Sequence, residues 1–245
     1  MKGTLSHRIK SILSTPEYIK VLILRTLGNF LIFSSIFMIA KTFYLPFREE
    51  IRYAIESRVE KKYIVVDTLT TKPDKVDEQV VQKGGLAQLL NIKQVEVLAP
   101  QNPEFSVVVP KIGANAQILP NIDPTRDSVY LEALKQGVAH AAGTSFPGEG
   151  GHIFLFAHST DYFWNVGSYN AVFYLLYKLE KQDEINVFYQ GTRHVYRVID
   201  KKVVDPQQVE YLTRKTNKEF LTLQTCWPPG TTLKRLLVFA VRVAE

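Results

Sequence analysis

The chain has 245 residues, of which 46% are hydrophobic and 22% charged, as in an ordinary globular protein. This composition argues against a disordered chain and against a polytopic membrane protein. Much of the net charge of +6 lies at the N-terminus, because residues 1–25 hold five basic side chains and one acidic one. The remaining residues carry only +2, so we expect no nucleic-acid partner.

An apolar run from Thr26 to Phe47 follows this basic tail, and its single charge, Lys41, lies near its end. About 20 apolar residues suffice for a helix that spans a bilayer. Lys41 can extend to the interface, where Phe43, Tyr44 and Phe47 resemble an aromatic belt. The basic flank keeps the N-terminus in the cytoplasm. We favour an uncleaved, single-pass anchor over a cleaved signal peptide or a buried core helix.

The residues after the run suggest further divisions of the chain. Arg48–Lys62 has the apolar spacing of an amphipathic helix, and residues 63–105 contain breakers such as Pro73, which indicate a stalk or a covering segment. The expected organisation is a cytoplasmic tail (1–25), a membrane anchor (26–47), a juxtamembrane helix and stalk (48–105) and an extracytoplasmic domain (106–245).

From residue 106 onwards the pattern predicts short strands separated by turns. The expected strands are Ser106–Val109, Ala116–Leu119, His152–Ala157, Glu184–Tyr189, His194–Ile199, Phe220–Thr225 and Leu236–Val243. Two short helices are expected, at Val129–Lys135 and Asn170–Leu179. Many short strands with few helices indicate a mainly β domain, a small closed or semi-closed barrel.

The chain contains one cysteine, Cys226, so an intramolecular disulfide is impossible. The count alone favours a buried core thiol. The position of Cys226 argues otherwise, because it follows the expected strand Phe220–Thr225 and precedes Trp-Pro-Pro-Gly. Side chains alternate along a strand, so if Leu221 and Leu223 face the core, the thiol points away from it.

Two polar side chains are candidate partners of this thiol. Arg235 opens the next expected strand, and pairing of the two strands would bring its guanidinium near the sulfur, unless it is only a solvated strand-edge arginine. His158 follows another apolar strand, a suitable place for proton transfer. His140 is the second choice of base, and His194 is expected on a hairpin surface. The sequence shows no metal-ligand spacing and calls for no cofactor.

The residues around Cys226 resemble a known signature. Thr222-Leu223-Gln224-Thr225-Cys226 looks like the T-L-x-T-C motif of sortases, and the continuation to Val238 is similar to their C-x-P-x-G…R-L-x-V pattern. Upstream segments fall in sortase order. They are Val109–Gly113, Leu131–His140, Gly143-Thr144, Pro147-Gly148 and Ala157-His158-Ser159. The resemblance covers residues 106–245 and is specific, because separated motifs agree in order and spacing.

The resemblance implies an eight-stranded sortase β-barrel and a cysteine transpeptidase. Cys226 would attack the Thr–Gly carbonyl of an L-P-x-T-G-like sorting signal, His158 would protonate the leaving amine, and Arg235 would stabilise the oxyanion. Thr225 would support the nucleophile. The partners would be proteins with a C-terminal sorting signal and an amine of the cell envelope. With no Asp-Pro-aromatic lid motif and no second apolar span after Val243, a housekeeping-like role is expected rather than pilus polymerisation.

Two other functions stay open at this point. A related cysteine endopeptidase would only hydrolyse its target, because water and an amine attack the same thioester. A membrane-tethered β-domain would bind a surface ligand without catalysis.

Overall fold

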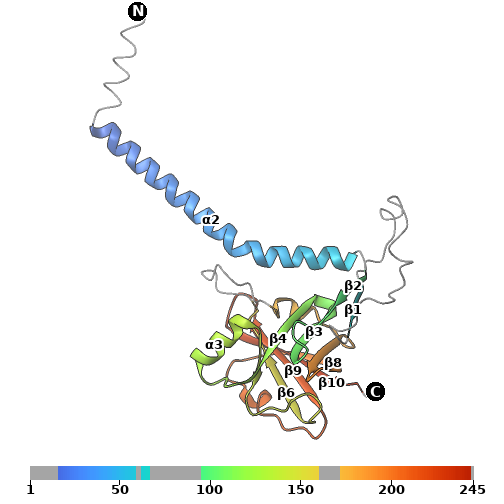
Figure 1. Ribbon diagram of the computed structural model, residues 1–245. Helices are drawn as coiled ribbons and strands as arrows, with labels where there is room; N and C mark the ends of the chain where they lie inside the picture. Colours follow the sequence, from blue (N-terminus) through green and yellow to red (C-terminus); the bar gives the residue numbers. More distant parts are fainter. Residues whose placement is uncertain (1–15, 59–61, 67–94, 160–171, 244–245) are drawn as a thin grey trace, which may run out of the picture. The chain divides into compact units, whose positions relative to one another are not determined.

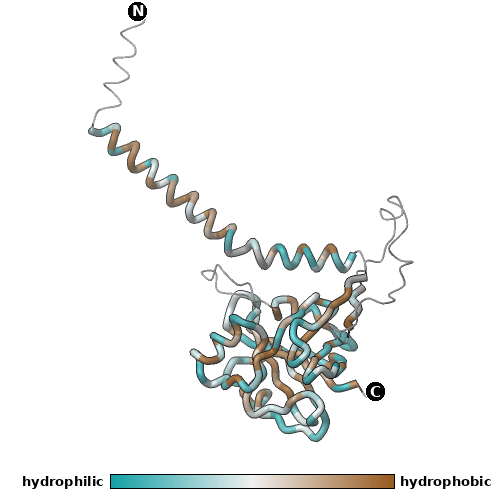
Figure 2. Tube along the Cα trace, in the orientation of Figure 1, coloured by the Kyte–Doolittle hydropathy of each residue, from teal (hydrophilic) through white to brown (hydrophobic). Residues whose placement is uncertain are grey.

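The computed structural model describes residues 16–58, 62–66, 95–159 and 172–243 (Figure 1). The chain divides into two compact units, Met1–Arg48 and Glu49–Glu245. Helix α2 runs from Pro16 to Arg58, and its apolar first part gives way to a more polar end (Figure 2). Its first part, Pro16–Lys41, is the one helical segment among the described residues that is long and apolar enough to cross a membrane. At 1.5 Å per residue it is about 39 Å long, more than a bilayer's hydrocarbon core.

The amphipathic helix that we expected at Arg48–Lys62 is the end of α2 rather than a separate element. The backbone stays helical through Pro46, although proline lacks the N–H of a helical hydrogen bond. The helix ends at Arg58, and Lys62 opens strand β1 (Lys62–Val65), which pairs in parallel with β2 (Val95–Leu98). Most of the expected stalk, residues 67–94, lies outside the described residues.

Eight further strands close into a barrel, as expected (Figure 1). They are β3 (Phe105–Val109), β4 (Ala114–Ile122), β5 (Val138–Ala141), β6 (His152–Phe156), β7 (Glu184–Tyr189), β8 (Thr192–Val204), β9 (Phe220–Trp227) and β10 (Lys234–Arg242). Their order around the barrel is β10-β8-β7-β3-β4-β5-β6-β9. The pairs β4–β5 and β6–β9 are parallel, and the other neighbours are antiparallel.

Alternating side chains give the barrel two apolar layers. The interior cluster fills the barrel and includes Ile153 and Leu155 of β6, Leu221 and Leu223 of β9, and Leu236 and Val238 of β10. The exterior cluster lies on the other face of the same strands and includes Phe154, Phe156, Leu237 and Phe239. Tyr211 and Leu212, from the chain between β8 and β9, pack against the exterior cluster. One stretch of barrel wall is therefore buried on both faces.

The short helices differ from expectation in one case. Helix α3 (Asp127–Gln136) contains the expected segment Val129–Lys135. The helix expected at Asn170–Leu179 is, in its described part, a turn followed by the 3₁₀ helix η4 (Tyr174–Lys178). Within the described residues the other 3₁₀ helices are η3 (Pro110–Ile112) and η5 (Val209–Tyr211).

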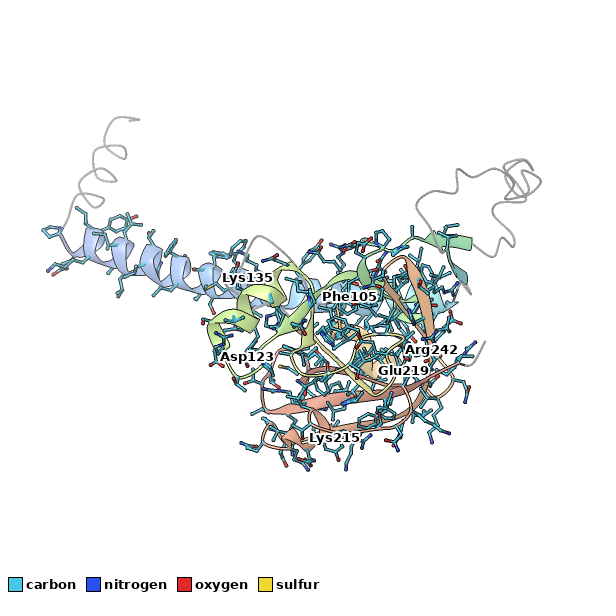
Figure 3. All side chains as sticks on the ribbon, turned by 60° about the horizontal axis from the view of Figure 1, so that its bottom comes forward. Phe105, Asp123, Lys135, Lys215, Glu219 and Arg242 are labelled. Atoms are coloured by element: carbon cyan, nitrogen blue, oxygen red, sulfur yellow. The ribbon has the colours of Figure 1, made fainter. Side chains whose placement is uncertain are left out.

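His194 is buried, so its expected place on a hairpin surface is wrong. Strand β8 alternates, and His194 shares the inward face with Tyr196 and Val198. Nη1 of Arg242 contacts Nδ1 of His194 and also forms an ion pair of 3.1 Å with Glu219. Figure 3 shows Arg242 and Glu219 side by side. Glu219 precedes β9, so this polar cluster lies at the end of the strand remote from Cys226.

Candidate active site

Cys226 is the penultimate residue of β9, and its Cα partner on the antiparallel strand β10 is Arg235. The strand continues two residues beyond its expected end at Thr225, because Cys226 pairs with Arg235 and Trp227 with Lys234. Pro228 is the first residue of this stretch without a backbone N–H, and the strand ends before it. The expected approach of Arg235 to Cys226 is thus a direct cross-strand pairing.

His158 reaches the same level from the other side of β9. Strand β6 is parallel to β9, with Phe156 opposite Gln224. The ladder continues past the end of β6, because the N–H of Ala157 donates to the carbonyl of Gln224 at 3.1 Å. If this register is continued by two residues along both segments, from the Phe156–Gln224 pair, His158 lies opposite Cys226. Cys226 is therefore flanked by His158 on one side and Arg235 on the other.

The alternation of the strands places these three side chains on one face of the sheet. Arg235 has the parity of Leu237 and Phe239 in the exterior cluster, and Cys226 has the parity of Phe220, which packs against that cluster. His158 continues the parity of Phe154 and Phe156. All three are half-buried. The triad therefore stands on the outer wall of the barrel, as the alternation of Leu221 and Leu223 in the sequence predicted for the thiol.

Burial and a nearby charge act on the Cys226 thiol in opposite directions. Burial disfavours the thiolate and raises the pKa of Cys226 above its usual value, whereas the Arg235 guanidinium lowers it and offsets part of this effect. Arg235 is held in place by its own loop, because Nη1 donates to the carbonyls of Thr232 at 3.0 Å and Lys234 at 3.2 Å. The guanidinium of Arg235 is therefore held where it can stabilise a negative charge that forms near the sulfur.

Thr225 links the strand of the thiol to the segment that carries the histidine. Its hydroxyl is buried and donates to the carbonyl of Ala157 at 3.0 Å. Ala157 immediately precedes His158, so this bond fixes the backbone of both flanking residues together. A second threonine of the strand, Thr222, contacts Nε2 of His152 at 2.8 Å. Burial, followed by the charge of Arg214, lowers the pKa of His152 to about 4, which keeps this imidazole neutral at physiological pH.

The structure does not bring His140 to the thiol. His140 is fully buried, has the parity of Val138 in the interior cluster and makes an edge-to-face contact with Phe105, with the ring centroids 5.7 Å apart. Its Nδ1 accepts the N–H of Asn121 at 3.3 Å, so Nε2 carries the proton and donates to the carbonyl of Ser145 at 3.1 Å. Burial lowers its pKa. His140 is thus a neutral, satisfied group on the opposite face of the sheet from Cys226.

The described part of the chain holds no group of three His, Cys, Asp or Glu side chains that could bind a metal ion. Sequence reasoning missed one feature near the thiol. The indole of Trp227 contacts the ring of Tyr177 in η4, with the ring centroids 5.4 Å apart. No local pattern links residues 50 positions apart, so only the fold reveals this contact.

Comparison with known proteins gives a consistent result. The family model described as the Sortase domain matches residues 107–243, more than half of the chain. Sortase D of Bacillus subtilis (strain 168) is 28% identical over 138 residues, which are 55% of this chain and 61% of the relative. The chain thus spans less than two thirds of that relative's length.

Solved structures of sortases are also similar to this chain. A lid mutant of sortase A from Corynebacterium diphtheriae is 28% identical, with a TM-score of 0.47, over 59% of this chain and 72% of the other. Sortase C-1 from Actinomyces oris is 27% identical, with a TM-score of 0.49, over 81% of this chain and 97% of the other.

The opposing effects on the thiol generate a prediction about pH dependence. Replacing Arg235 by Ala removes the positive charge that lowers the thiol pKa, so the pKa of Cys226 should rise further. The thiolate is the reactive form. The rate of alkylation by iodoacetamide, measured across pH in the full-length protein, should therefore fall at each pH below the plateau, and its midpoint should move to higher pH.

The matched control for this measurement is Lys234→Ala. Lys234 is the exposed neighbour of Arg235 and forms an ion pair with Asp205 at 2.9 Å. Its loss should leave the profile unchanged. Identical profiles for Arg235→Ala and the parent protein would contradict an effect of Arg235 on the thiol.

Proposed function

The chain belongs to the sortase family, and on this basis we propose that it is a membrane-anchored cysteine transpeptidase with Cys226, His158 and Arg235 as its catalytic residues. The observation that carries the proposal is the alignment of Cys226 with a candidate partner on each neighbouring strand segment of the sheet. Arg235 is the cross-strand partner of Cys226 on β10, and the β6–β9 register, continued two residues past the Phe156–Gln224 pair, supports His158 as its neighbour on the other side. A nucleophile, a proton carrier and a fixed cation on one face of a sheet are what covalent acyl transfer requires.

In the first step the Cys226 thiolate attacks the carbonyl carbon of the Thr–Gly bond in an L-P-x-T-G-like sorting signal. The negative charge that develops on the carbonyl oxygen is stabilised by Arg235. As the tetrahedral intermediate collapses, the carbon–nitrogen bond breaks and His158, in its protonated form, gives its proton to the leaving amine. The products are a thioester on Cys226 and a free amine that begins with glycine.

In the second step an amine of the cell envelope attacks the thioester. Neutral His158 accepts a proton from the attacking nitrogen, and the carbon–sulfur bond breaks. This step returns the Cys226 thiolate and protonated His158 to their starting states, so the cycle needs no cofactor. The substrate proteins with a C-terminal sorting signal, the acceptor amine and the housekeeping-like role are all part of the proposal.

The location is proposed from the N-terminal part of the chain. The helix Pro16–Lys41 has the length and composition of a membrane span, and the basic residues precede the apolar run. This charge asymmetry supports an N-terminus in the cytoplasm and a barrel on the outer side of the membrane. Substrate proteins and the acceptor would then meet the site on that side.

Replacement of the three catalytic residues tests this function directly. With the full-length protein in detergent, a sorting-signal peptide and a glycine-based amine, Cys226→Ala should abolish both cleavage and transfer. His158→Ala should lower kcat by about 10²–10⁴-fold, and Arg235→Ala by about 10²–10³-fold. Lys234→Ala is the surface control and should keep parental turnover. Circular dichroism should report an intact barrel in every variant.

Product analysis separates the proposal from its two rivals. Transfer products should increase with amine concentration at the expense of hydrolysis products. Hydrolysis alone at saturating amine would identify an endopeptidase instead. Anchoring of substrate proteins that persists in Cys226→Ala would identify a non-catalytic binding module.

A further prediction concerns Thr225 as a positioning residue. Thr225→Val keeps the shape of the side chain but removes the hydrogen bond to the carbonyl of Ala157, so the backbone before His158 loses its link to β9. We expect kcat to fall roughly tenfold, since small misplacements of catalytic groups have effects of this size. Thr225→Ser keeps the hydroxyl and should restore most of the loss in kcat. Equal turnover in the Val and Ser variants would contradict this role.

A further inference from the structure

The last turns of α2, Glu49–Arg58, belong to the same compact unit as the barrel and pack against it. The ring of Tyr53 packs against the interior cluster. Arg52 donates from Nη2 to the carbonyl of Ile112 at 3.3 Å, and it lies so close to Gly113 that an added Cβ there would be 2.8 Å from Nη1. This segment is therefore a docked part of the domain that carries Cys226.

Glu50 joins this segment to η4 through two polar contacts. Its carboxylate accepts a hydrogen bond from the hydroxyl of Tyr177 and forms an ion pair of 3.2 Å with Lys178. The Lys178 ammonium also lies 5.2 Å from the centre of the Tyr53 ring. Burial and the bond to Glu50 raise the pKa of Tyr177, so the phenol keeps the proton that it donates. The contact between Tyr177 and Glu50 is thus a charge-assisted hydrogen bond, which is among the stronger hydrogen bonds in proteins.

Tyr177 also contacts Trp227, the residue next to the proposed nucleophile. Its ring lies 5.4 Å from the indole of Trp227, with an angle of 54° between the two planes. Trp227 follows Cys226 directly and is the last residue of β9. An unbroken line of contacts therefore leads from Glu50 through Tyr177 to Trp227, and by one peptide bond to Cys226.

We propose that Glu50 is a positioning residue of the active site, which holds Tyr177 against Trp227 and so fixes the end of β9 at which Cys226 stands. The segment Glu49–Arg58 then contributes to the geometry of the active site. The inference rests on the proposed function only for its effect on turnover. Its effect on Trp227 and on the thiol can be measured without any substrate.

The experiment uses the indole of Trp227 as its reporter. The chain has two tryptophans, so Trp164→Phe leaves Trp227 as the single tryptophan in the full-length protein, and it is excited at wavelengths that tyrosine does not absorb. In this parent we compare Glu50→Ala, which removes the carboxylate, with Glu50→Gln, whose amide oxygen can still accept the hydrogen bond. Tyr177→Phe removes only the hydroxyl, so it tests the same hydrogen bond independently if Glu50→Ala fails to fold. The control is Glu132→Ala, an exposed carboxylate on α3 that pairs with Lys135.

The expected result is an emission of Trp227 shifted to longer wavelength in Glu50→Ala and Tyr177→Phe, because a loosened indole meets more water. Turnover in these two variants should fall roughly tenfold. Glu50→Gln should recover most of both effects, and Glu132→Ala should match the parent. Parental emission, or parental turnover, in folded Glu50→Ala and Tyr177→Phe would overturn the inference.

A failure of the proposed function has a different signature. If the parent itself does not cleave or transfer a sorting-signal peptide, the function is wrong, and the rate at which a bulky maleimide labels Cys226 replaces turnover as the second readout. A changed labelling rate together with shifted emission in Glu50→Ala and Tyr177→Phe then supports the positioning role. Parental values of either measurement overturn it.

Discussion

The pairing of β9 with its two neighbours is the constraint on which the candidate site depends. Arg235 is the cross-strand partner of Cys226 in the antiparallel register with β10. The parallel register with β6, continued two residues past the Phe156–Gln224 pair, sets His158 opposite Cys226. Side chains alternate along a strand, so a slip of one residue in either register would move a partner to the opposite face. The interior cluster prevents such a slip, since it would expose Leu221, Leu223, Leu236 and Val238. The hydrophobic core thereby sets the alignment of Cys226, Arg235 and His158, although these side chains lie on the outer face of the sheet.

The same wall of the barrel explains the electrostatics of the thiol. Exterior packing of Phe154, Phe156, Leu237 and Phe239 dehydrates the sheet face from which Cys226 projects. Burial raises the thiol pKa, and Arg235 counteracts it only in part. A dry environment weakens the thiolate as a resting species but strengthens the attraction between Arg235 and any negative charge that forms during reaction. The bond from Thr225 to the carbonyl of Ala157 links the backbone before His158 to β9. The proposed line from Glu50 through Tyr177 to Trp227 would restrain the end of that strand.

Sequence reasoning predicted the face of Cys226 and its pairing with Arg235 better than it predicted their surroundings. Alternation of Leu221 and Leu223 placed the thiol on the outer face, and the short loop before Arg235 predicted the pairing that the structure has. Strand β5 was missed because Val138–Ala141 is too short for a period of two to be recognised. His194 was misplaced because a hairpin residue can face either way, and its inward direction depends on the whole register of β8. The contact between Tyr177 and Trp227 follows only from barrel closure.

The most direct test of the account is capture of the thioester on Cys226. The full-length protein is mixed with a sorting-signal peptide in the absence of an amine, quenched in acid, digested and analysed by mass spectrometry. The account predicts that the acyl part of the peptide, ending at threonine, is attached to the fragment that contains Cys226 and is released by hydroxylamine. Peptide cleavage with the acyl group on another residue, or with none on Cys226 at any quench time, would contradict it.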